Sequence, residues 1–116
     1  MFTFSNLGIL VCSVFAAEVD VEFDRDVVPV LRRHCLKCHH SKAGKGGFRI
    51  DSVEGLFTSG KHGIPVVAGT PEISHLISRV TSDDVHQRMP PDGTGLSEFE
   101  IDVLTRWIKQ GASVSQ

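Results

Sequence analysis

The sequence predicts an all-α domain in which three to four short helices are joined by long loops. Apolar residues recur at helical spacing in three stretches, and helix start signals precede them. A chain of 116 residues is long enough for one compact core but not for two. Loops of this length in so small a domain need a bulky apolar group to pack around.

The first 17 residues differ in composition from the rest of the chain. Residues 1–17 contain no Lys, Arg, Asp or Glu, and a short apolar run from Leu7 to Phe15 precedes Ala16 and Ala17. A secretory signal peptide has this pattern, although no basic residue precedes the apolar run. We therefore expect a signal peptide over 1–17, a functional domain over 18–116, and export to the periplasm or a similar compartment. The alternative is a buried N-terminal helix.

The first helix of the domain leads into a pair of cysteines. Asp24 is expected to cap a helix that begins near Arg25, with Pro29 close to its first turn. Helical spacing then continues as far as Cys35 and Cys38. Whatever these two sulfurs hold therefore lies against the core.

Two further short helices are expected in the middle of the chain. Asp51 and Glu54 predict a capping box for a helix through Phe57, and Thr70 followed by Pro71 opens another. Along that second helix, apolar residues follow the i, i+3, i+4, i+7 pattern and should face the core: Ile73, Leu76, Ile77 and Val80.

The last helix follows a segment that cannot be helical. In "MPPDGTG", residues 89–95, two adjacent prolines donate no amide protons, and Pro-Asp-Gly indicates a turn. Ser97 and Glu100 then predict a capping box for a helix that runs to Gln110 and ends at Gly111. The residues of this helix expected at the core are Ile101, Leu104 and Ile108, with Trp107 beside them.

The stretch "CLKCHH", residues 35–40, carries the chemistry. Cys-x-x-Cys-His is the pattern of c-type haem attachment, because both sulfurs can reach one porphyrin edge and His39 can bind the iron from the same helical face. A redox dithiol is one alternative, but it needs a βαβ context that this chain lacks. A structural zinc site is another, and it needs a further ligand from His62, His75 or His86.

Met89 is the candidate for the second axial ligand of the iron. It is the single methionine in 18–116, and it lies in the segment "RMPPDG", which its prolines stiffen into an extended strap. Ligation by His and Met raises the reduction potential and closes the site, which suits electron transfer. The alternatives are that Met89 fills a gap in the core, or that His86 is the ligand.

The motifs "CLKCHH", "GGFRIDSVEGLFTSG" and "RMPPDGTGLSEFEIDVLTRWIKQGA" together resemble the planctomycete-type cytochrome c domain of the class I c-type cytochromes. The resemblance implies one haem c attached through Cys35 and Cys38, with His39 as the proximal ligand and Met89 as the distal one. It also implies that the first and last helices cross beside the haem. Such domains often stand at the front of long exported proteins, so a sequence that ends at Gln116 is expected to be either a small carrier or part of a longer protein.

The expected function is that of a monohaem electron carrier, not an enzyme, which meets redox partner proteins. The net charge of −2 gives no basic field for nucleic acid, and no membrane association is expected after removal of the signal peptide. The alternatives are a haem enzyme or gas sensor with a labile sixth ligand, and a zinc-stapled interaction module. Arg49 or Arg88 is expected to face a haem propionate. The residues expected around the haem are Leu31, Phe48, Ile50, Ile64, Leu76, Ile77, Leu104 and Trp107.

Overall fold

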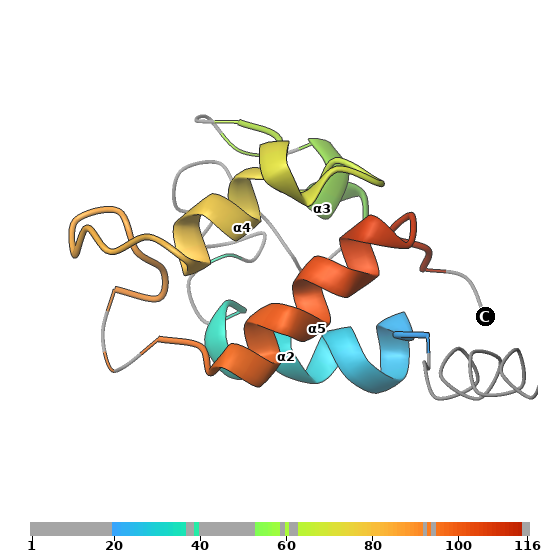
Figure 1. The fold of residues 1–116 in the computed structure, drawn as a ribbon, viewed down its shortest axis with the longest axis horizontal. Helices are drawn as coiled ribbons and strands as arrows, with labels where there is room; N and C mark the ends of the chain where they lie inside the picture. Colours follow the sequence, from blue (N-terminus) through green and yellow to red (C-terminus); the bar gives the residue numbers. More distant parts are fainter. Residues whose placement is uncertain are drawn as a thin grey trace, which may run out of the picture.

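The computed structural model of the chain describes residues 20–36, 39, 53–58, 60, 63–91, 93 and 95–114. Within these residues the secondary structure is helical and includes no strand, which confirms the predicted all-α class (Figure 1). The predictions for 1–17, for Cys38 and for 48–51 lie outside the described residues. The elements are η1 (Phe23–Val27), α2 (Val28–His34), α3 (Val53–Thr58), η3 (Pro71–Ile73), α4 (His75–Val80) and α5 (Glu98–Lys109).

The first helix begins earlier than predicted. The π-helical turn η1 starts at Phe23 with Glu22 as its N-cap, so the prediction that Asp24 is the cap was wrong. Asp26, inside η1, accepts the N–H of this N-cap residue on its carboxylate at 2.8 Å. The π-helical turn ends where α2 begins, next to Pro29. In a regular α-helix the ring of Pro29 would clash with a carbonyl of the preceding turn, and the wider π-helical turn relieves that clash.

The helix predicted from Thr70 is divided into two elements. Thr70 and Pro71 open the 3₁₀ turn η3, and α4 starts only after Ser74. Ser74 is buried, and its hydroxyl accepts the N–H of Val67 at 2.8 Å and donates to the carbonyl of Thr70 at 3.0 Å. These bonds stabilise the extended backbone that separates η3 from α4.

The division changes which side chains reach the core. Ile73, predicted to face the core, is 66% exposed because it belongs to η3 and not to the helical phase of α4. Leu76 and Val80 are buried as predicted, and Ile77 is partly buried.

The last helix agrees closely with its prediction. The Ser97 hydroxyl accepts the N–H of Glu100 at 3.1 Å, and the Glu100 carboxylate accepts the N–H of Ser97 at 2.9 Å, which completes the capping box. At the other end, Gly111 has a φ of 114°, which suits a residue without a side chain. The N–H of Ala112 donates to the carbonyl of Trp107 at 2.9 Å, as in a Schellman motif.

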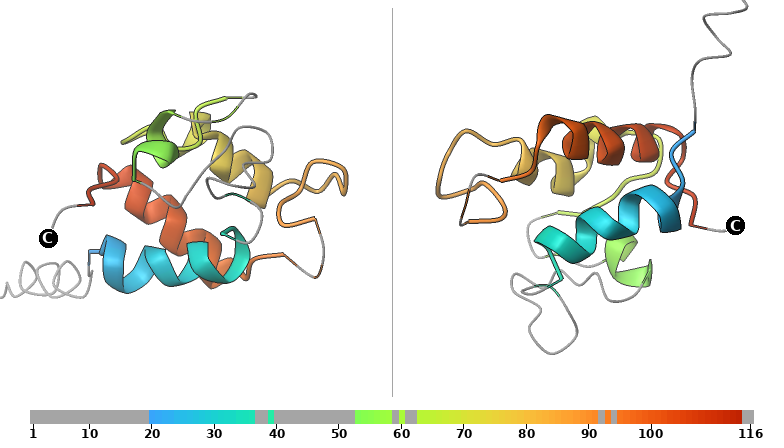
Figure 2. Two further views of the ribbon diagram at one scale, coloured as in Figure 1. Left: turned by 180° about the vertical axis from the view of Figure 1, so that it is seen from behind. Right: turned by 90° about the horizontal axis from the view of Figure 1, so that it is seen from below.

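Helix α5 is the central element of the fold. It crosses η1 and α2 on one side and contacts η3 and α4 on the other (Figures 1 and 2). Trp107 of α5 is 1% exposed and lies 5.3 Å from the ring of Phe23 and 6.5 Å from that of Phe57, measured between centroids. Its indole N–H donates to the carbonyl of Ser113 at 2.9 Å. The indole therefore joins η1, α3 and the segment after α5 in one core.

No helix in the described part of the chain is both long and apolar enough to cross a bilayer.

Candidate functional site

Helix α2 brings the first cysteine to the edge of the core. The N–H of Cys35 donates to the carbonyl of Leu31 at 2.9 Å, so Cys35 caps the C-terminal end of α2. Cys35 is 8% exposed and belongs to the core cluster. Val30 and Leu31, which precede it, are buried in the same cluster.

His39 lies one helical turn beyond Cys35. Its N–H donates to the carbonyl of Cys35 at 3.1 Å, a bond from residue i+4 to residue i. This bond brings the backbone of His39 next to that of Cys35. His39 is half-buried, and Cys38 lies outside the described residues.

The environment of Cys35 is unlike that of a reactive thiol. Burial, with a smaller contribution from the negative charge of Glu100, raises the pKa of the Cys35 thiol to about 12. Redox-active cysteines have a lowered pKa, because the thiolate is the reactive form. The redox-dithiol alternative therefore finds no electrostatic support at Cys35.

The histidines considered as zinc ligands differ in their surroundings. His75 accepts a hydrogen bond from the Arg79 guanidinium at its Nε2 atom, at 3.1 Å. His86 is exposed, and His62 lies outside the described residues. No group of three or more His, Cys, Asp or Glu side chains forms a metal site within the part of the chain that the structure describes.

Met89 lies on a segment that is bonded back to α4. Its N–H donates to the carbonyl of Arg79 at 2.9 Å, and its side chain is half-buried. The turn before it is closed by bonds from the N–H groups of Gln87 and Arg88 to the carbonyl of Asp84, both at 2.9 Å. His86, the other ligand candidate, is exposed on that turn.

Arg88 has a buried nitrogen that lacks a partner. Its Nε atom is shielded from solvent and makes no hydrogen bond in the described structure. The side chain passes Gly95 closely, since a Cβ at that position would lie 3.8 Å from Arg88 Cδ. A buried guanidinium nitrogen without an acceptor is costly, and an anionic group such as a propionate would satisfy it. This environment fits the haem that the cysteine motif indicates.

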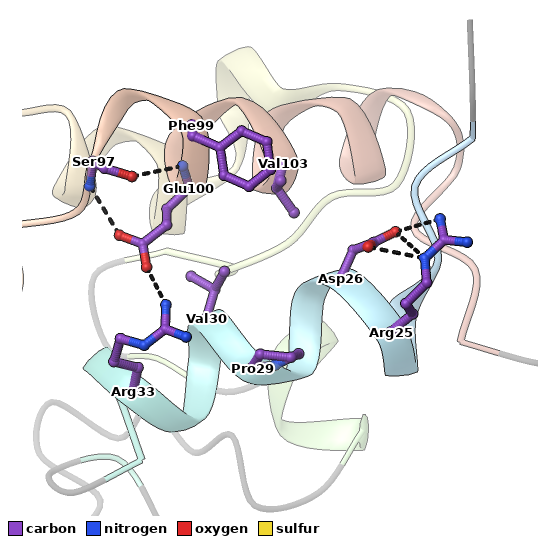
Figure 3. A pocket seen from close by; sticks show the side chains of 9 residues that line it. All are labelled: Arg25, Asp26, Pro29, Val30, Arg33, Ser97, Phe99, Glu100 and Val103. Carbon is purple, nitrogen blue, oxygen red and sulfur yellow. Dashed lines mark hydrogen bonds and ion pairs between the residues drawn. The ribbon is translucent and has the colours of Figure 1, made fainter.

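Glu100 joins the cysteine-bearing helix to α5. Its Oε2 atom lies 3.0 Å from His34 Nε2. The same atom pairs with the guanidinium of Arg33 (Figure 3). Partial burial alone would raise the pKa of Glu100, but hydrogen bonds from the Ser97 backbone, His34 and Arg33 outweigh it and lower the pKa to about 2. The carboxylate is therefore ionised at neutral pH and fixes the end of α2 against the start of α5.

A groove runs between η1–α2 and α5 (Figure 3). Val30, Phe99 and Val103 line it, together with the Arg33–Glu100 pair. Neither Cys35, His39 nor Met89 is among its lining residues. The groove is therefore separate from the residues that the sequence assigns to haem.

The residues predicted around the haem are only partly in the core. Leu31, Leu76, Leu104 and Trp107 are buried, and Ile77 is partly buried. Ile64 is 50% exposed, so it lies outside the protein core, and its place beside the haem stays a prediction. Its carbonyl accepts the N–H of His75 at 3.0 Å. Phe48, Arg49 and Ile50 lie outside the described residues.

A family model described as planctomycete cytochrome C matches residues 35–93, just over half of the chain. The chain belongs to this family. The match begins at the first cysteine of "CLKCH" and ends just after "RMPP", so it includes Cys35, Cys38, His39 and Met89. A cytochrome c domain implies covalently bound haem c and a role as a haem-binding electron carrier, and such domains are typically exported. No curated protein and no solved structure matches the chain.

The sequence did not predict two sets of contacts: those of Arg79 with the segment that carries Met89, and those of Glu100 with Arg33 and His34. The Ser97–Glu100 spacing predicted only the local cap, whereas Arg33 and His34 lie 67 and 66 positions away. Arg79 follows His75 by one helical turn, which is a signal for contact between them, but nothing local connects it to Met89.

Proposed function

We propose that the chain is a monohaem c-type cytochrome that transfers single electrons through an iron ligated by His39 and Met89. The observation that carries the proposal is the helical turn from buried Cys35 to His39, in a chain of the planctomycete cytochrome c family. When bound, haem c supplies a one-electron couple between ferric and ferrous iron.

Each site residue has a distinct role in this proposal. Cys35 and Cys38 hold the porphyrin through thioether bonds, and the His39 imidazole is the proximal ligand. The Met89 thioether fills the sixth position, which leaves no open coordination site for a substrate and favours a carrier over an enzyme. Arg88, with its unpartnered Nε atom, neutralises a haem propionate.

The proposed location follows from the composition of the N-terminal segment. Residues 1–17 act as a signal peptide, and 18–116 form the cytochrome c domain in the periplasm or an equivalent compartment. Its partners there are redox proteins that donate or accept one electron during brief contact.

The test is the ligation of the iron in the full chain, produced together with haem-attachment machinery. The ferric protein should show the charge-transfer absorption of a thioether bound to iron, and the reduced protein should resist carbon monoxide. Met89→Ala should abolish that absorption, admit carbon monoxide and lower the reduction potential. Val85→Ala is the matched control, since Val85 is an apolar residue of the same loop and is 63% exposed.

The opposite result would favour the second function. If the unaltered reduced protein binds carbon monoxide as readily as Met89→Ala does, the sixth ligand is labile, and a haem enzyme or gas sensor becomes the better explanation.

A further inference from the structure

The segment that carries Met89 is attached to α4 at two points, and both belong to Arg79. The carbonyl of Arg79 accepts the N–H of Met89 at 2.9 Å. The guanidinium of the same residue donates from Nη1 to the carbonyl of Gln87 at 3.1 Å. One residue in the last turn of α4 therefore holds the strap on both sides of Arg88.

The guanidinium of Arg79 is itself held in one orientation. Its Nε atom donates to His75 Nε2 at 3.1 Å, one turn earlier on α4. His75 is confined in turn, because a Cβ at Gly63 would lie 3.3 Å from the Cβ of His75. The Ser78 hydroxyl donates to the carbonyl of His75 at 2.9 Å. His75 thus orients Arg79, and Arg79 holds the strap.

Helix α4 is a rigid base for this attachment. Leu76 and Val80 are buried, and α4 contacts α5. Of the residues between α4 and Met89 that the burial pattern describes, most are exposed: Thr81, Asp83, Asp84, Val85, His86 and Gln87. Packing therefore contributes little to the position of the exposed residues. Within the described residues, the main-chain bond from Met89 and the guanidinium bond to Gln87 both connect this loop to α4, and only the second depends on the Arg79 side chain.

We propose that Arg79 is a positioning residue that holds the Met89 strap against α4 and so keeps the sixth coordination position of the iron closed. The inference rests on the proposed ligation by His39 and Met89. Ordering the backbone of one residue costs about 1–2 kcal/mol, so a free strap would lose much of its ligand affinity to entropy. A strap that the protein orders in advance avoids this cost and keeps the sulfur close whenever its bond to iron opens.

The experiment measures how readily an external ligand displaces Met89. Imidazole is titrated into the ferric holoprotein, and its dissociation constant is compared between Arg79→Gln and the unaltered chain. We expect imidazole to bind about tenfold more tightly to Arg79→Gln, which corresponds to about 1.4 kcal/mol. The thioether charge-transfer absorption should weaken in parallel.

Arg106→Gln is the matched control. Arg106 also lies in the last turn of a helix, and it pairs with Asp102 at 3.6 Å, away from the strap. This variant should bind imidazole as the unaltered chain does. Arg79→Lys, which keeps one donor for the Gln87 carbonyl, should restore part of the resistance to imidazole. A purely structural role would lower the unfolding free energy without changing imidazole affinity under native conditions.

Two results would overturn the proposal, and they differ in what else they reject. If Met89→Ala tightens imidazole binding but Arg79→Gln does not, Arg79 has no positioning role although Met89 remains the ligand. If neither variant changes imidazole binding, the ligand assignment fails, and the role of Arg79 fails with it. Should Arg79→Gln not fold, His75→Ala makes the same test, because it removes the acceptor that orients the guanidinium.

Discussion

Replacement of Glu100 by Gln tests the contact that fixes the cysteine-bearing helix against α5. Glutamine can still complete the capping box with Ser97, because its side-chain oxygen accepts the same backbone hydrogen bond. The substitution removes the negative charge that faces Arg33 and His34, and it replaces the accepting Oε2 atom with an amide NH2 group that donates. We expect the free energy of unfolding of the haem-loaded protein to fall by about 1–2 kcal/mol at pH 7.

The magnitude follows from the electrostatics of the carboxylate. The pKa of Glu100 falls from its ordinary 4.5 to about 2 in the folded chain, although partial burial acts in the opposite direction. Each pKa unit corresponds to about 1.36 kcal/mol, so the carboxylate stabilises the fold by at most about 3–4 kcal/mol. Arg33 is 59% exposed, and solvent screening reduces its share. Glutamine also keeps the bond to the Ser97 backbone, which lowers the expected loss further.

The assay is urea unfolding followed by circular dichroism at several pH values. Because the pKa of Glu100 is lowered on folding, its contribution is complete above about pH 5 and is lost as the pH falls through about 2. The difference between Glu100→Gln and the unaltered chain should therefore be constant near neutrality and should shrink towards zero in acid.

Asp102→Asn is the matched control for this prediction. Asp102 carries the same charge on the same helix, but its ion pair with Arg106 at 3.6 Å is exposed, so the change should cost less than about 0.5 kcal/mol. A loss for Glu100→Gln no larger than that of Asp102→Asn, or a loss that persists unchanged at pH 2, would refute the reasoning.

Three further substitutions test the core, the cap and the buried guanidinium. Leu104→Ala should lower the free energy of unfolding by about 2–5 kcal/mol in a urea titration, because Leu104 is fully buried, whereas Phe99→Ala, at a site 75% exposed, should change it little. Ser97→Ala should cost about 1 kcal/mol in the same titration by removing the hydroxyl that accepts the Glu100 N–H, and an unchanged midpoint would argue against the cap. Arg88→Gln should lower the reduction potential in a redox titration, because a positive charge near the iron favours the ferrous state; a potential equal to that of the unaltered protein would reject the propionate contact.

The features predicted correctly from the sequence are those that depend on neighbouring residues. The capping box of α5 needs only Ser97 and Glu100, three positions apart, and its end needs only Gly111. The end of α5 follows the same local logic, because the N–H of Ala112 closes it on the carbonyl of Trp107. These capping motifs are defined by a few neighbouring residues, so they can be identified in the sequence without knowledge of the fold.

The features that were missed depend on distant contacts. The exposure of Ile73 depends on Ser74, whose hydroxyl bonds to the backbone of the preceding loop and separates η3 from α4. The spacing of apolar residues does not predict the interruption between η3 and α4. The bonds between Arg79 and the residues Gln87 and Met89 form only because the chain turns back toward α4. No local sequence pattern predicts them.

The early start of the first helix has a similar explanation. Asp24 is the predicted cap because Asp is a preferred N-cap residue, whereas Glu is not. In the structure Glu22 is the N-cap, and the Asp26 carboxylate reaches back across the wider turn before Pro29 to accept its N–H.

The central claim is that the chain holds one haem through two thioether bonds at Cys35 and Cys38. Mass spectrometry of the intact, denatured holoprotein measures this directly. The account predicts a mass that exceeds that of the polypeptide by one haem, and a return to the polypeptide mass when both cysteines are replaced by alanine. A polypeptide mass without haem in the unaltered protein, or pigment that washes away in acidified acetone, would contradict it.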